Sequence, residues 1–140
     1  MGVYSGVILP LVLVVSGVLA LVGLMTLFLP RLHRVLGIAT AATYAAVAVH
    51  LVAVIVVLAT GNAAGLVLTL GYLLASVALL PLLGIGRLGT PEAAAGDADP
   101  DRPVLAPDQI ARVDGGAAVV IAITLAVLAW RVLEILEAGA

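Results

Sequence analysis

The chain has 140 residues, of which 64% are hydrophobic and 10% charged, and its formal net charge is −2. A soluble domain of this length is about 45–50% apolar and about 25% charged, so this composition excludes a soluble monomer. The absence of cysteine excludes disulfides and thiol chemistry, and the six arginines form no basic stripe that would indicate a nucleic-acid partner.

The first half of the chain contains two apolar runs without Asp, Glu, Lys or Arg. The first predicted span covers residues 7–29 and ends before Pro30, and the second covers residues 35–60 and ends at the turn-forming pair Gly61–Asn62. About 20 apolar residues cross a hydrocarbon core of about 30 Å, so each run is long enough for a transmembrane helix.

The second half contains two further apolar runs, at residues 63–85 and 116–136. Pro81 lies within the third run and is expected to kink the helix. Residues 87–114 are proline-rich and acidic, which predicts a flexible loop. From residue 107 this loop carries helix-start signals, and the pattern leaves open whether 107–137 is one continuous helix or has a hinge at residues 115–116. The fold class is therefore all-α, a polytopic membrane protein with four transmembrane helices in an antiparallel bundle.

Arginine positions predict the orientation of these spans. Five of the six arginines lie in the 31–34 link and the 87–114 loop, and only Arg131 lies on the opposite side. The positive-inside rule places the arginine-rich side in the cytoplasm. We therefore expect both termini outside and the 87–114 loop in the cytoplasm of a bacterial cell, with the chain in its inner membrane.

Polar side chains inside the spans suggest one candidate site. His50 lies on a face of small residues in the second span, a surface typical of close helix packing, so it is expected to face protein. If the Gly61–Asn62 turn folds the second and third spans together, His50 meets Tyr72 or Ser76, and we predict a hydrogen bond to one of them. This candidate intramembrane patch comprises Thr43, His50, Thr69, Tyr72 and Ser76.

Other polar residues are expected at the membrane surfaces, where aromatic and charged side chains are enriched. Arg131 and Glu134 are three positions apart on a predicted helix and are expected to pair. The predicted interfacial residues are Arg31, His33, Arg34, Trp130, Arg131 and Glu134.

No cofactor, metal site or catalytic set is predicted. The two histidines, His33 and His50, are 17 residues apart, or about 25 Å along a helix, which is too far to bind one haem within one subunit. No nucleophile–base pair or phosphate-binding glycine loop is present, so an enzyme is not expected.

Two apolar segments carry a family resemblance. The segment from Gly71 to Pro81, GYLLASVALLP, and the final helix ending WRVLEI at 130–135 resemble an uncharacterised family of small four-span actinobacterial integral membrane proteins. The resemblance covers about the last half of the chain, which differs in its long acidic loop. It implies a four-span fold in a bacterial inner membrane and assigns no functional residue.

The absence of charge at mid-membrane depth argues against a charge-driven pump. The leading expectation is an accessory or assembly subunit without catalytic activity, whose small-residue faces pack against other membrane helices. The alternative is a small transporter or channel that works as a homo-oligomer around the His50 patch. The expected partners are the lipid bilayer and other membrane helices, from further copies or a larger complex.

Overall fold

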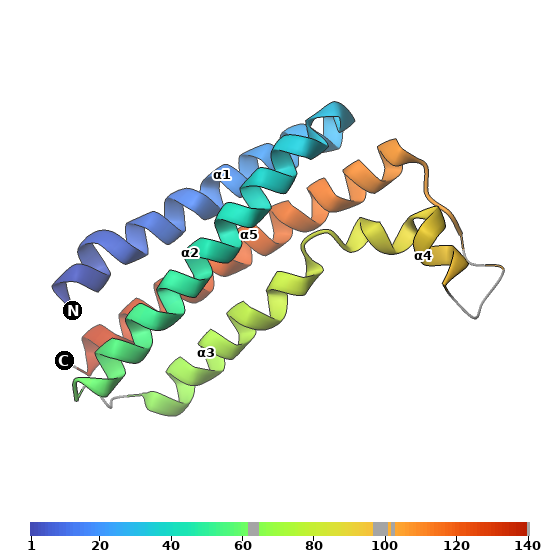
Figure 1. Cartoon of the computed structure of the whole chain (residues 1–140). Coiled ribbons are helices and arrows are strands. Elements are labelled where there is room, and N and C mark those ends of the chain that lie inside the picture. The colour runs from blue at the N-terminus through green and yellow to red at the C-terminus, as the bar shows by residue number, and fades with distance from the viewer. Residues whose placement is uncertain (62–64, 97–100, 102, 140) are drawn as a thin grey trace.

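The computed structural model describes residues 1–61, 65–96, 101 and 103–139. All regular secondary structure in these residues is helical (Figure 1). The long helices are α1 (Leu9–Phe28), α2 (His33–Ala59), α3 (Leu66–Leu79) and α5 (Pro107–Ala138). The shorter ones are η1 (Tyr4–Ile8), η2 (Pro30–Leu32), η3 (Leu80–Leu82), η4 (Ile85–Gly89) and α4 (Pro91–Ala95).

Four helical stretches are long and apolar enough to cross a membrane, as the sequence predicts. They comprise Tyr4–Phe28, Pro30–Ala59, Leu66–Gly89 and Pro107–Ala138. Their apolar character and length are the properties that a hydrocarbon core of about 30 Å requires.

The last helix starts earlier than residue 116, the predicted beginning of the fourth span. Helix α5 is continuous from Pro107, so residues 107–114 are helical and do not belong to the loop. Pro107 occupies the first turn, where its missing N–H is not needed, and the Ala106 N–H donates to Gln109 Oε1 at 2.9 Å. Of the two alternatives that the sequence leaves open, the structure has the continuous helix.

The third helix ends at Leu79, where the sequence predicts a kink. Pro81 lies in the 3₁₀ turn η3, after which Leu83 is extended and Gly84 is left-handed, with φ +85°. Proline removes a helical hydrogen bond, and the chain leaves the helix instead of bending it. Asn62 and residue 63 at the predicted α2–α3 turn, and residues 97–100 and 102 of the predicted loop, lie outside the described residues.

The long helices bury seams in which the spacing alternates between three and four residues. This spacing averages 3.5 residues and keeps one seam facing its neighbours along a whole helix. On α1 the seam comprises Leu9, Val12, Ser16, Leu19, Gly23 and Thr26. On α5 it comprises Ala111, Gly115, Ala118, Ala122, Leu125, Ala129, Val132 and Leu136. The α5 seam passes through Gly115 without interruption, which explains why there is no hinge.

Helix α5 is the main packing partner of α1 and α3. Helix α1 packs most extensively on α5 and also packs on α2, whereas α3 packs mainly on α5 and only slightly on α2. In Figure 1, α3 is correspondingly separated from α1 by α2 and α5. The second and third spans therefore do not form the close hairpin that the sequence analysis assumed.

Candidate functional site

The predicted hydrogen bond from His50 to Tyr72 or Ser76 is wrong. His50 is buried, as expected, but its Nδ1 lies 3.5 Å from the hydroxyl of Tyr4, in the turn before α1. The two rings are 5.7 Å apart at their centroids. Because α2 packs on α1 rather than closely on α3, the partner of His50 comes from the N-terminal turn.

The other members of the predicted patch do not join His50 in one polar site. The hydroxyls of Thr43 and Ser76 donate to carbonyl oxygens of their own helices, at 2.8 and 2.9 Å. Tyr72 interacts with Arg131 of α5. His50 Nε2 and Thr69 Oγ1 are buried and have no hydrogen-bond partner among the described residues.

The predicted ion pair near the end of α5 is confirmed. Arg131 donates to Glu134 Oε2 at 2.6 Å, and the indole N–H of Trp130 donates to Glu134 Oε1 at 3.2 Å. All three residues are exposed, and Glu134 lies one turn after Trp130 and Arg131. This cluster is therefore a surface network without a buried charge, and Arg131 also links it to Tyr72 of α3.

A buried polar contact that the sequence does not predict lies at the other end of the protein. Asp114, assigned by the sequence analysis to the acidic loop, is 4% exposed on α5. Its Oδ2 accepts a hydrogen bond from His33 Nε2 at 2.6 Å, and its Oδ1 accepts one from the Gly86 N–H at 2.7 Å. Since a carboxylate only accepts hydrogen bonds, the His33 nitrogen is the donor. His33 therefore departs from the predicted role of a residue that only faces the membrane surface, whereas Arg31 and Arg34 are exposed as expected.

Three elements bring these groups together. Helix α2 begins at His33, directly after η2, so the imidazole lies at the start of the helix. The left-handed Gly84 turns the chain after α3 and leads into η4. Gly86 then lies against α5: a Cβ at this position would be 2.7 Å from Asp114 Oδ1 and 2.8 Å from the Ile110 carbonyl oxygen. A glycine is needed here because any side chain would push η4 off α5.

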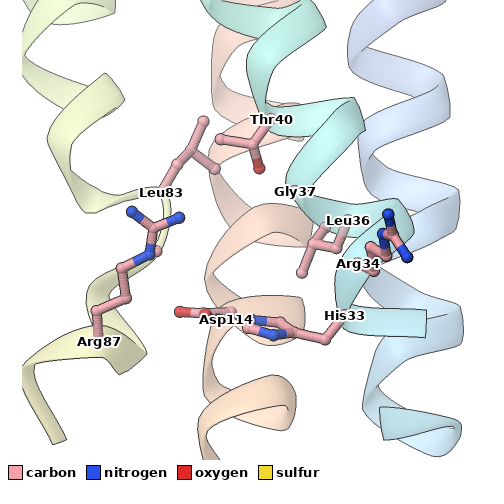
Figure 2. Close-up of a pocket in the computed structure, with 9 residues that line it drawn as sticks. His33, Arg34, Leu36, Gly37, Thr40, Leu83, Arg87 and Asp114 are labelled. Carbon is pink, nitrogen blue, oxygen red and sulfur yellow. Dashed lines mark hydrogen bonds and ion pairs between the residues drawn. The ribbon is translucent and has the colours of Figure 1, made fainter. Parts of the chain in front are cut away.

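The contact forms the floor of a cavity of about 300 Å³ between α2 and the α3–η4 connection (Figure 2). It is lined by His33, Arg34, Leu36, Gly37, Thr40, Leu83, Gly84, Arg87 and Asp114. Figure 2 shows the imidazole beside the carboxylate, with Arg87 on the η4 side and Thr40 above on α2. Charged, polar and apolar side chains thus converge at one place in the fold.

One sequence signal identifies Asp114 as a buried residue. Ala111, Gly115 and Ala118 already follow the three- and four-residue spacing of the rest of α5, and Asp114 lies beside this seam. Extending the fourth span backwards along this pattern places the carboxylate inside the helix packing. Its partners, His33 and Gly86, follow from no local pattern.

Comparison with known proteins adds no assignment. No protein-family model, curated protein or solved structure matches the chain. In the part of the chain that the structure describes, no group of three or more His, Asp and Glu side chains is placed to hold a metal ion.

Proposed function

We propose that this chain is a multi-pass protein of the bacterial inner membrane. In this proposal it forms an antiparallel four-helix bundle with both termini outside and serves as an accessory or assembly subunit that packs against other membrane helices and catalyses no reaction. The large apolar side chains on the outer faces of the helices support insertion, because a water-soluble protein rarely exposes so many in continuous patches.

One observation carries the assembly role. Gly71 and Ala75, one turn apart on α3, line a shallow apolar groove of about 320 Å³ whose other walls include Leu68 and Leu128. A Cβ at Gly71 would meet nothing within 4 Å, so the backbone there is open to the outside. Small residues four apart let a second membrane helix approach closely.

The small residues of α1 and α2 serve a different purpose. Ser16 and Gly23 on α1, and Ala39 and Ala46 on α2, are buried within the chain itself. Because they are covered by neighbouring helices of the same chain, they are not free for a partner. The Gly71–Ala75 groove is the outward-facing surface on which the assembly proposal rests, and its occupant is a transmembrane helix of another protein.

A second candidate is the homo-oligomeric transporter or channel. The buried atoms without partners, His50 Nε2 and Thr69 Oγ1, favour it, because such atoms often mark water or ligand sites. Against it, His50 is only 2% exposed, and the hydroxyls of Thr43 and Ser76 donate to backbone carbonyl oxygens. We therefore rank it second.

The assembly proposal is tested by purification in mild detergent, with the particle mass measured and the co-purifying proteins identified. We expect one copy in a larger complex, and we expect Gly71→Leu to release the partner. Gly17→Leu on α1 is the matched control, because a Cβ there also meets nothing within 4 Å. A stable homo-oligomer, or equal loss in both variants, would contradict the proposal.

Orientation is tested separately with single cysteines, since the chain has none of its own. Ser5→Cys and Thr90→Cys lie at opposite ends of the helices. A membrane-impermeant thiol reagent added to intact cells is expected to label position 5 and not position 90. The reverse pattern would contradict the proposed topology.

A further inference from the structure

Two arginines that have no ion-pair partner among the described residues line the cavity over Asp114. Arg34 belongs to the first turn of α2 and Arg87 to η4, and both are exposed. Among the described residues no carboxylate pairs with either group. Arg87 lies back over Gly84, where a Cβ would be 3.6 Å from Arg87 Nε.

The one carboxylate in the cavity is already engaged. Asp114 Oδ1 accepts from the Gly86 N–H and Oδ2 from His33. Two arginines, one aspartate and an imidazole that is neutral or positive give the cavity a net positive charge. Figure 2 shows the two guanidinium groups on opposite sides of Asp114, with Arg34 directed away from Arg87. Exposed like charges at one cavity without a counter-charge attract an anion, and low-dielectric walls strengthen that attraction.

The uncharged residues of the cavity and the geometry of arginine favour a phosphate group as the anion. The Thr40 hydroxyl lines the same wall and makes no hydrogen bond to another described residue, so it is available as a donor. Leu36 and Leu83 supply apolar walls. Arginine forms paired hydrogen bonds with phosphate oxygens, a geometry that a lysine or a neutral donor does not reproduce.

We propose that this cavity binds the phosphate group of an anionic phospholipid, with Arg87 and Thr40 as donors, the exposed Arg34 side chain turning toward the same phosphate, and the leucines against the glycerol and upper acyl chain. Two sources can supply such a phosphate group, a lipid headgroup and a soluble phosphate. Basic pockets between membrane helices bind lipid headgroups, and the arginines lie at one end of the apolar stretches, where headgroups would be.

The test measures lipid binding by native mass spectrometry of the purified chain in detergent, titrated with phosphatidylglycerol or phosphatidylcholine. We expect phosphatidylglycerol to bind preferentially, and the double variant Arg34→Gln/Arg87→Gln to weaken it at least tenfold. The matched control is Arg112→Gln, which removes a charge from an exposed position of α5 outside the cavity. Equal weakening by the control would overturn the site, because it would show general attraction to a basic surface.

Two further arms separate the phosphate sources and exclude misfolding. Inorganic phosphate and glycerol 3-phosphate are added as competitors, and we expect neither to displace the lipid at millimolar concentration. Displacement by either would overturn the lipid assignment.

Arg87→Lys keeps the charge and the fold but not the paired hydrogen-bond geometry, so we expect lipid binding of intermediate strength. Binding as strong as that of the wild-type protein would overturn the proposed role of the guanidinium. Because these measurements do not involve the α3 groove, they succeed or fail independently of the assembly proposal.

Discussion

Gly23 of α1 and Gly115 of α5 face each other so closely that neither position has room for a Cβ. A Cβ on Gly23 would lie 2.8 Å from the Gly115 carbonyl oxygen, and a Cβ on Gly115 would lie 2.7 Å from the Gly23 carbonyl oxygen. The obstacle is backbone in both directions, so a flexible side chain cannot move aside. Close packing between these helices therefore depends on both glycines.

The Gly23 contact predicts a stability difference between two otherwise equivalent variants. Gly23→Ala and Gly17→Ala both introduce a methyl group into α1, so their gains in helix propensity cancel. The difference between them is the overpacking cost, about 1–3 kcal/mol. Thermal unfolding in one detergent should show Gly23→Ala less stable than Gly17→Ala; equal stabilities would contradict the close helix crossing.

The approach of η4 to α5 predicts that Gly86→Ala is destabilising. The added methyl group would contact Asp114 Oδ1 and the Ile110 carbonyl oxygen, so η4 must move and the Gly86 N–H must lose its acceptor. We expect a loss of about 2–3 kcal/mol from overpacking and the lost hydrogen bond. Gly96→Ala is the control, since a Cβ there makes only ordinary contacts of 3.7 Å or more. Unfolding in detergent is measured for both, and a neutral Gly86→Ala would refute the contact.

Two substitutions of Asp114 should differ in a defined order. Asp114→Asn keeps a side-chain oxygen for the Gly86 N–H, whereas Asp114→Ala leaves this buried N–H without an acceptor. An unsatisfied buried polar group lowers the free energy of unfolding by about 1–3 kcal/mol. The Asp114→Ala variant should therefore be less stable than Asp114→Asn by this amount. Chemical denaturation in mixed micelles is a suitable measurement. The opposite order of stability would show that the side-chain oxygen at position 114 does not accept the hydrogen bond from the Gly86 N–H.

The Tyr4–His50 contact predicts that substitutions of these two residues have non-additive effects on stability. His50→Leu removes a buried ring with one unpartnered nitrogen, and we expect a change within about 1 kcal/mol. Tyr4→Phe alone should cost about 1 kcal/mol or less, because the hydrogen bond of 3.5 Å is long. In the His50→Leu background the same change should cost nothing. A double-mutant cycle in thermal unfolding measures this coupling, and additive losses would exclude the hydrogen bond.

His50→Leu also separates packing from function. If His50 serves packing alone, the variant keeps both its fold and its association with a partner. Loss of the partner at an unchanged unfolding temperature would instead contradict a packing role alone and assign His50 a function. The measurement combines the unfolding temperature with partner co-purification on the same sample.

The helices follow from the sequence because their signal is strong and local. Long apolar runs, bounded by Pro30 and Gly61, predict helices without knowledge of their neighbours. The extra two turns of α5 were harder to predict, because the acidic residues and prolines around 107–114 resemble a loop. The three- and four-residue spacing from Ala111 onward is the feature that distinguishes helix from loop there.

The candidate sites depend on which helices are neighbours, and local pattern does not specify this. The predicted pairing of His50 with Tyr72 requires that helices adjacent in the chain pack together. Instead, α3 packs on α5, and the Tyr4 hydroxyl reaches His50. The His33–Asp114 pair joins residues 81 positions apart, so neither the periodicity nor the composition of the sequence predicts it.

The central place of α5 has a consequence for how the protein is made. Helix α5 follows α1, α2 and α3 in the chain, yet it is the main packing partner of α1 and α3. During synthesis, the Gly23 face of α1 and the Leu73 face of α3 have no partner until Pro107–Ala138 leaves the ribosome. Assembly therefore follows translation of the last helix, and a nascent chain stalled before residue 107 would hold three helices without their common core.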